Sequence, residues 1–371
     1  MVTKVQIPIL DLARQYKQIG VEVEKTVIEI LRSGHYVLGS YNQKLEETFA
    51  KYVGAKYALP VGSGTDALLL ALVALGVKAG DEVITTPFTF IATAEIISYL
   101  GARPVFVDID PNTYCIDPKA VEKAITNKTK VIIPVHLYGQ GADMPALKAI
   151  AQKYNLKILE DACQAVGAVQ NGQRIGVLGD IAAFSFFPTK NLGAMGEGGI
   201  ITTNDEKAYQ MMKALRAHGS HIRYEHEYVG YNARLDEIQA AIVWIKTKHI
   251  ENWNKRRGEI AAKYNEAFVK LGIKTPKVFD GNSHVYHQYV IEVPNRDAFI
   301  KTMSEKGIST AVHYPKPLHL QPAYQNLGYK AGSFPIAEKA SKAVISLPSF
   351  PELSDEEITF IIESVTQAIR S

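Results

Sequence analysis

The stretch at residues 57–75 reads YALPVGSGTDALLLALVAL and carries the pattern on which the fold depends. Its first five residues, Tyr57–Val61, form a short apolar run that is typical of a buried strand, and the glycine-rich residues 62–64 follow as a turn. The periodicity from Thr65 to Leu75 then predicts a helix. A buried strand that leads through a tight turn into a helix is the repeating unit of an α/β sheet.

The alternation of strand and helix continues to residue 203. Short apolar runs predict further strands at Glu82–Thr85, Pro104–Val107, Val131–Val135, Lys157–Glu160, Ala182–Phe186 and Gly199–Thr203. Helical periodicity lies between most of them, at Phe90–Leu100, Pro118–Ile125 and Met144–Tyr154. This pattern predicts a largely parallel, doubly wound sheet.

Helical patterns flank this block on both sides. We expect two helices before it, at Ile19–Leu31 and Gln43–Lys51, and one long segment after it, Leu235–Leu271, interrupted at most near Gly258. The remainder mixes strand, helix and strand, at Val285–Val293, Arg296–Lys306 and Thr310–Val312, and ends in an amphipathic helix at Asp355–Ile369 that Ser354 caps and Glu357 completes as a capping box. The prediction is a large α/β domain at residues 1–245, N-terminal helices included, and a smaller α+β domain at 246–371.

Composition excludes several classes of protein. With 371 residues, 47% hydrophobic and 21% charged, the chain is ordinary for a globular protein, and its net charge of +3 with no Lys/Arg block argues against nucleic-acid binding. The two cysteines, Cys115 and Cys163, form neither a disulfide framework nor a metal-type spacing. No signal-peptide pattern and no run of eighteen apolar residues is visible, so we expect a cytoplasmic protein without a membrane span or a metal.

Lys190 occupies an unusual place, in the segment FSFFPTKNLG at Phe184–Gly193. A lysine beside phenylalanines is poorly hydrated, and desolvation disfavours the ammonium form and frees the amine to attack a carbonyl carbon. Taken alone, Lys190 is better explained as a surface lysine whose stem covers apolar residues. Partners elsewhere in the chain decide between these interpretations.

Asp161 is the first such partner. It closes the apolar strand at Leu156–Leu159 in the segment EDACQ, where an unpaired carboxylate would be costly. An acid that faces a pyridinium nitrogen, together with a lysine that forms a Schiff base, is what pyridoxal phosphate chemistry requires. Gln164 lies three residues on and would donate to a ring oxygen. The alternative for Asp161 is a cap of the next element.

The turn after the first strand is a candidate anion site. Residues 61–67, VGSGTDA, open a helix with small residues, so backbone N–H groups can approach a phosphate, and the Thr65 hydroxyl adds a donor. An ordinary helix cap at Ser63 or Thr65 explains the turn equally well. The spacing fits neither a dinucleotide fingerprint nor a P-loop nor a hydrolase elbow.

Three further residues and one loop lie near strand or helix ends, each with an ordinary structural explanation beside the functional one. Phe90 would stack on a flat heterocycle or simply pack in the core, and Asn232 would bind an anion or cap the helix that follows it. The loop HYPKPLH at 313–319 is stiffened by two prolines and would line a substrate pocket or serve as a structural loop. His136 would support a site or be a satisfied core histidine.

Together these motifs resemble the fold-type-I, pyridoxal-phosphate-dependent nucleotide-sugar aminotransferases, often called the DegT/StrS type. The resemblance runs from Pro8 to the last helix and rests on five motifs in this order: SGTDAL, EDACQ, SFFPTKNLG, GYNARLDEIQAA and HYPKPLH. Each alone is weak, and their joint occurrence is specific.

The resemblance implies a role for each motif residue. Lys190 is expected to bond covalently to pyridoxal 5'-phosphate (PLP) and to move the proton, and Asp161 to pair with the ring nitrogen. The other expected cofactor contacts are Gln164 at the ring hydroxyl oxygen, Phe90 on the ring face, and Gly64, Thr65 and Ser185 at the phosphate. Asn232 is expected to reach the phosphate of a neighbouring subunit, which makes a homodimer with shared sites. His313 and Tyr314 are expected to line the sugar-nucleotide site.

The implied reaction moves an amino group from glutamate, through the pyridoxamine form of the cofactor (PMP), to a keto group of a nucleotide-linked hexose in amino-sugar and polysaccharide biosynthesis. A 3-keto sugar is favoured, and a 4-keto sugar is the alternative. A sugar dehydratase of this family would lack the lysine, so Lys190 argues against it. The alternative of a different class is a regulatory protein that keeps the fold without catalysis, against which the intact motifs weigh.

Overall fold

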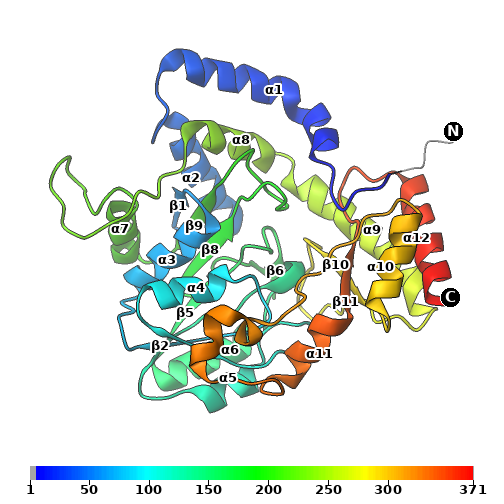
Figure 1. Ribbon diagram of the computed structural model, residues 1–371. Coiled ribbons are helices and arrows are strands. Elements are labelled where there is room, and N and C mark those ends of the chain that lie inside the picture. The colour runs from blue at the N-terminus through cyan, green and yellow to red at the C-terminus, as the bar shows by residue number, and fades with distance from the viewer. Residues whose placement is uncertain (1–5, 371) are drawn as a thin grey trace.

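A computed structural model describes residues 6–370, and at its centre lies a seven-stranded sheet (Figure 1). From one edge to the other the strands are β1 (Tyr57–Val61), β9 (Gly199–Thr203), β8 (Ile181–Ser185), β5 (Lys157–Asp161), β4 (Thr129–Ile132), β2 (Glu82–Thr85) and β3 (Arg103–Phe106). β9 runs antiparallel to both of its neighbours, and the other paired strands are parallel. The predicted strands and the largely parallel sheet are therefore confirmed, with boundary shifts of up to three residues.

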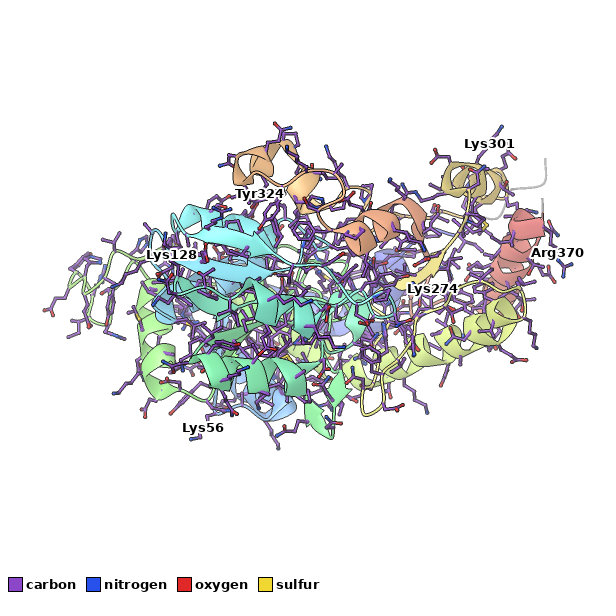
Figure 2. All side chains as sticks on the ribbon, turned by 90° about the horizontal axis from the view of Figure 1, so that it is seen from below. Lys56, Lys128, Lys274, Lys301, Tyr324 and Arg370 are labelled. Atoms are coloured by element: carbon purple, nitrogen blue, oxygen red, sulfur yellow. The ribbon has the colours of Figure 1, made fainter. Side chains whose placement is uncertain are left out.

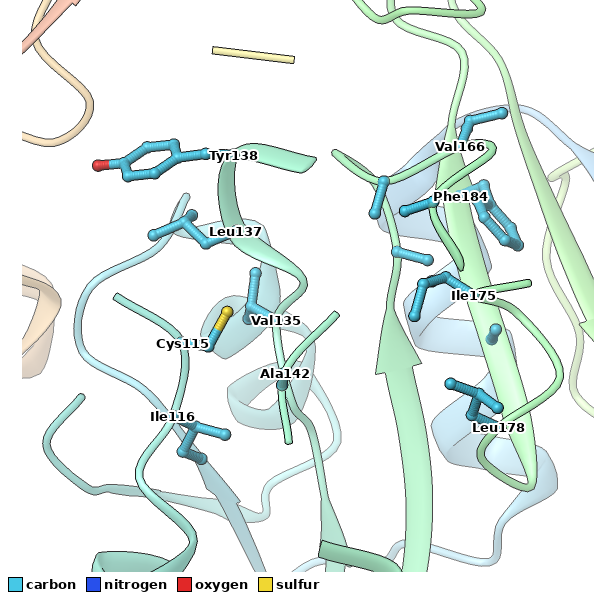
Figure 3. Packing of buried hydrophobic residues seen from close by; sticks show 14 of the residues in the cluster. Cys115, Ile116, Val135, Leu137, Tyr138, Ala142, Val166, Ile175, Leu178 and Phe184 are labelled. Atoms are coloured by element: carbon cyan, nitrogen blue, oxygen red, sulfur yellow. The ribbon is translucent and has the colours of Figure 1, made fainter. Parts of the chain in front are cut away.

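Both faces of the sheet are buried, because successive side chains of a strand point to opposite sides. On β5, for example, Ile158 belongs to one apolar cluster and Leu159 to the other. The first cluster includes α2 (Ser40–Val53), α5 (Pro118–Ala124), α6 (Met144–Tyr154) and α8 (Glu237–Thr247); Figure 3 shows part of it, with Leu137 and Tyr138 near Val135. The second includes α3 (Gly64–Ala74), α4 (Ala92–Tyr99) and α7 (Glu206–Leu215).

Two of the helices outside the central block differ in their bounds from expectation, α1 and the long segment after the block. The first helix, α1, is Leu12–Ser33, longer than expected because Asp11 caps it through its side chain. The segment expected to be continuous from Leu235 is instead two helices, α8 and α9 (Ile250–Val269), and they part at Lys248 and His249, not near Gly258. Gly258 lies inside α9, where an added Cβ would meet open space, so nothing forces a break there.

The C-terminal elements form a third apolar cluster around α9, α10 (Arg296–Glu305) and α12 (Asp355–Arg370). Seen from below, α10 with Lys301 and α12 with Arg370 lie at one end of the molecule (Figure 2). The capping box is confirmed, since the Glu357 N–H donates to Ser354 Oγ at 3.2 Å and the Ser354 N–H to Glu357 Oε2 at 2.9 Å.

The strands of this region were predicted less well. β10 is only Tyr289–Glu292, and it pairs with β11 (Val344–Leu347). β11, α11 (Pro335–Ala343) and the earlier helix α7 were not predicted from the sequence. The expected strand at Thr310–Val312 is wrong: a single bridge joins Ala311 to Ser346. A short hairpin, β6 (Val169–Gln170) and β7 (Gln173–Arg174), and 3₁₀ turns at Leu137–Gly139, Leu318–Leu320 and Pro322–Leu327 complete the described elements.

Every helix within residues 6–370 is too short or too polar to cross a bilayer. In the same part of the chain, no three His, Cys, Asp or Glu side chains gather in a way that would hold a metal ion.

Candidate active site

A cavity of about 560 Å³ lies where the central strands end, which is where α/β sheets bind their ligands. β5 supplies Asp161 and β8 supplies Ser185, and the start of α3 supplies Ser63, Gly64 and Thr65. The topology thus places side by side residues that are far apart in the sequence. The remaining polar and aromatic side chains of the wall include Thr89, Phe90, Thr93, Cys163, Gln164, Lys190, Glu197, His287, His313 and Tyr314.

Lys190 lines this cavity and is half-buried. Desolvation lowers the pKa of its amine, opposed by the charges of Cys163 and Asp161. Of the three phenylalanines before it, Phe184 and Phe186 turn away and pack edge-to-face on Phe49, whereas Phe187 lines the cavity. The cavity wall, to which Phe187 belongs, therefore keeps water from the amine.

Asp161 is buried, with 5% of its surface exposed, yet both of its oxygens have partners. The Thr93 hydroxyl donates to Oδ2 at 2.7 Å, and the Cys163 N–H donates to Oδ1 at 3.2 Å. The strand is itself anchored, since the Asp161 N–H donates to the Pro134 carbonyl and the His136 N–H to the Asp161 carbonyl. The carboxylate is thus held at a fixed angle toward the cavity.

Gln164 has an orientation that its neighbours determine. The Tyr138 N–H donates to its Oε1 at 2.8 Å, so the amide nitrogen faces the cavity, where it donates to the Tyr314 hydroxyl at 3.1 Å. One hydrogen of that amide nitrogen is left for another acceptor. The segment with His313 and Tyr314 is held by a second hydrogen bond, which the Tyr138 hydroxyl donates to the His313 carbonyl.

The start of α3 is built to hold an anion. Ser63 is the N-cap: its Oγ accepts from the Asp66 N–H at 3.0 Å, and its carbonyl accepts from the Ala67 N–H. The N–H groups of Gly64 and Thr65 have no such partner within the described chain and point outward from the helix. A Cβ on Gly64 would lie 2.8 Å from Ser185 Cβ, so only glycine lets the two segments meet here.

The aromatic and imidazole side chains form another part of the wall. Phe90 exposes 57% of its surface and is not a core residue, and its ring lies 6.5 Å from that of Tyr314. His313 Nδ1 lies 2.9 Å from Ser346 Oγ, and burial, followed by the charge of Lys190, lowers its pKa to about 4. The segment that begins at His313 therefore belongs to the cavity and is not only a connecting loop.

Two of the singled-out residues lie elsewhere. Asn232 is exposed and is not part of the cavity; its Oδ1 accepts from Arg234 NH2 at 2.7 Å. His136 is fully buried, with Nδ1 accepting from the Ala142 N–H, so Nε2–H donates to Glu160 Oε2 at 3.0 Å. His136 is therefore a core histidine with both ring nitrogens hydrogen-bonded, which was one of the two alternatives.

The structure adds residues that sequence reasoning did not find, chiefly Thr93 and His287. His287 Nδ1 lies 3.2 Å from Asn191 Oδ1, and the amide of Asn191 already donates to Asn254 and Val285, so Nδ1 carries the hydrogen and Nε2 is an acceptor. Burial lowers the pKa of His287, and the charge of Lys190 adds to the effect. A lone threonine and a lone histidine carry no sequence signal that marks them.

These residues suit PLP. The free N–H groups at the start of α3 with the crowded Gly64–Ser185 contact offer a phosphate cradle, and the exposed face of Phe90 offers a stacking surface for a flat ring. A fixed carboxylate at Asp161 and a poorly hydrated amine at Lys190 lie in the same cavity. The donor set thus contains a partner for each part of the cofactor.

Comparisons with known proteins agree with this geometry. The model of the DegT/DnrJ/EryC1/StrS aminotransferase family matches residues 17–366. A "pleiotropic regulatory protein" of Geobacillus stearothermophilus is 51% identical, over 98% of this chain and 99% of its own. The dTDP-3-amino-3,6-dideoxy-alpha-D-galactopyranose transaminase of Aneurinibacillus thermoaerophilus is 46% identical, over 97% of this chain and 99% of its own.

Solved structures of aminotransferases superpose closely on this chain. DesV of S. venezuelae, in complex with a ketimine intermediate, superposes with a TM-score of 0.97 at 41% identity, over 99% of both chains. NtdA of Bacillus subtilis with bound cofactor PMP superposes with a TM-score of 0.92 at 34% identity, over 99% of this chain and 86% of that one.

Proposed function

Because the chain belongs to the DegT/DnrJ/EryC1/StrS aminotransferase family, we propose that it moves an amino group from glutamate to the 3-keto group of a nucleotide-linked hexose. It is a PLP-dependent sugar aminotransferase of the α/β fold shared by its relatives. The donor and the position of the keto group are the parts that the proposal adds.

One observation carries the assignment of the site: a single cavity unites the Lys190 amine, the Asp161 carboxylate and the free N–H groups at the start of α3. When bound, PLP supplies an electron sink that stabilises a carbanion at the carbon bearing the amine. The protein side chains would bind and orient the cofactor and the substrate and move the proton.

Lys190 is proposed to bond to the cofactor aldehyde and afterwards to carry the proton between the substrate carbon and the cofactor. Desolvation lowers the pKa of its amine, which favours the unprotonated form that can accept that proton. Asp161 would hold the ring nitrogen protonated, and the remaining amide hydrogen of Gln164 would reach the ring hydroxyl oxygen. Phe90 would cover the ring.

Gly64, Thr65 and Ser185 would bind the phosphate at the start of α3, where the helix dipole also favours negative charge. His313 and Tyr314 would meet the sugar nucleotide on the open side of the cavity. A neutral imidazole at His313 can donate or accept toward a sugar hydroxyl without adding charge.

Asn232 supports a shared site in a homodimer. It follows a long loop after α7 that extends away from the body of the molecule (Figure 1). Apolar side chains on this loop are exposed, 62% at Ile222, 79% at Tyr224 and 96% at Val229. A second copy that covers this loop would bury them, and Asn232 would then reach the partner's phosphate site.

The name of one relative supports the 3-keto position. The transaminase of Aneurinibacillus thermoaerophilus is named for a 3-amino sugar, and 97% of this chain aligns with it. A 4-keto sugar remains the alternative within the family. The regulatory relative raises the other alternative, a protein without catalysis, but a cavity that unites Lys190, Asp161 and the start of α3 argues for an enzyme.

A half-reaction assay tests the proposal. Enzyme converted to the pyridoxamine form is mixed with nucleotide-linked 3-keto and 4-keto hexoses, and recovery of the PLP absorbance is followed. We expect recovery at least tenfold faster with a 3-keto sugar, and conversion to the pyridoxamine form by glutamate. Faster recovery with a 4-keto sugar would contradict the proposed 3-keto substrate. If none of the keto sugars restores the PLP absorbance, the proposed function is wrong. Lys190→Ala is the control that fails with all of them.

A further inference from the structure

Thr93 makes a hydrogen bond that its position in a helix does not predict. A threonine within a helix can donate back to the carbonyl three or four residues earlier. Thr93 is the second residue of α4, and its hydroxyl instead crosses to β5 and donates to Asp161 Oδ2 at 2.7 Å. Only 1% of Thr93 is exposed, so this is the contact that satisfies its buried hydroxyl.

A second threonine extends this contact. Thr89 Oγ1 lies 3.1 Å from Thr93 Oγ1, and Thr89 is also buried. Asp161 as a carboxylate can only accept, so the single hydrogen of Thr93 goes to it. Thr89 must then be the donor to Thr93. The result is a directed chain of two hydroxyls that ends on one carboxylate oxygen, and such chains strengthen their members.

The segment that carries these threonines also carries Phe90, which faces the cavity. One short stretch, residues 89–93, therefore covers the ring position and braces the carboxylate behind it. With Thr93 on Oδ2 and the Cys163 N–H on Oδ1, rotation of the carboxylate would break two hydrogen bonds at once.

We propose that Thr93, supported by Thr89, is a positioning residue that orients Asp161 toward the ring nitrogen of the cofactor. This rests on the proposed roles of Asp161 and Lys190. The Thr93 hydroxyl touches neither the cofactor nor the substrate in this assignment; it acts through the carboxylate.

Thr93→Val removes the hydroxyl and keeps the shape, and Thr93→Ser keeps the hydroxyl. Apoenzyme of each variant is titrated with PLP, and the pH dependence of the visible band of the bound cofactor is recorded. We expect Thr93→Val to bind PLP about 10- to 100-fold more weakly, as for the loss of a hydrogen bond to a charged group, and to shift the pH midpoint of the band. Thr93→Ser should restore both to within about threefold and a few tenths of a pH unit of the wild type.

Two further comparisons separate positioning from a structural role. In an Asp161→Ala background Thr93→Val should weaken PLP binding no further, because its effect passes through the carboxylate. An equal loss in that background, or wild-type binding and pH midpoint in Thr93→Val, would overturn the proposal. If the apoenzyme of Thr93→Val fails to fold, Thr89→Val is used instead. We expect Thr89→Val to bind PLP about three- to tenfold more weakly than the wild type. Unchanged PLP binding by Thr89→Val would contradict the hydrogen-bond chain from Thr89 through Thr93 to Asp161.

The wild-type titration separates the two levels of inference. A wild-type apoenzyme that does not bind PLP contradicts the proposed function. A wild-type apoenzyme that binds PLP, with Thr93→Val equal to it, leaves the function standing and contradicts only the role of Thr93.

Discussion

His313 is held neutral by its surroundings, and this has a consequence for acid stability. Burial and the charge of Lys190 lower its folded-state pKa to about 4, against an ordinary value of 6.5. Between these two pH values the unfolded chain therefore binds more protons than the folded one, so the free energy of unfolding falls as the pH drops from 6.5 to 4. Burial also lowers the pKa of His284, to about 3.

His313→Asn should flatten part of this dependence. Urea unfolding of the apoenzyme at pH 7 and pH 4.5 measures it: we expect the variant to lose less unfolding free energy between the two pH values than the wild type. His284 leaves a residual slope in the variant. Equal losses in both proteins would mean that His313 does not contribute.

At the scale of elements, α2 has a cap that comes from another helix. Its own N-cap, Gly39, has no side chain to accept a hydrogen bond. Glu237, the first residue of α8, is buried and accepts instead from the N–H groups of Gly39, Tyr41 and Asn42, at 2.9, 2.6 and 3.3 Å. One carboxylate thus joins the starts of two helices whose positions differ by 198 residues.

Glu237→Ala should therefore lower the free energy of unfolding by about 3 kcal/mol, because several buried N–H groups lose their acceptor. Glu237→Gln keeps one acceptor oxygen and should lose less. Glu47→Ala, at an exposed position of the same α2 helix, is the matched control and should change stability by less than about 0.5 kcal/mol. Urea unfolding followed by circular dichroism compares the three, and a Glu237→Ala variant as stable as Glu47→Ala would contradict this account of the cap.

At the scale of the whole molecule, the proposed site with Asn232 would need two chains, because Asn232 lies outside the cavity of the chain that carries it. Lys190→Ala and Asn232→Ala should each be inactive or nearly so. Mixed after dissociation and reassociation, they should recover roughly a quarter of the wild-type activity, since half of the dimers are then mixed and one of their two sites is complete. Absence of recovery in a mixture shown to contain mixed dimers would contradict the shared site.

The division into domains at residue 245 stays a prediction, and residues 1–5 of the first expected domain and residue 371 of the second lie outside the described part of the chain. The N-terminal segment has an unexpected place. Ile7 is fully buried in the C-terminal apolar cluster and bridges Ile308, with the Ser309 N–H donating to its carbonyl at 2.9 Å. The N-terminal segment is therefore tied to the C-terminal apolar cluster.

Most of the local elements and the class of chemistry follow from the amino-acid sequence alone. Strand and helix periods, the capping box of Ser354 and Glu357, and the motif around Lys190 are set by residues a few positions apart, so short-range patterns reveal them. Short-range patterns did not predict the break between α8 and α9 or the short pairing of β10 with β11. Contacts between distant parts of the chain determine where those elements end. Only the tertiary structure brought Thr93 to Asp161 and Glu237 to the start of α2, since contacts between distant residues depend on how the sheet is wound and leave no periodic mark in the sequence.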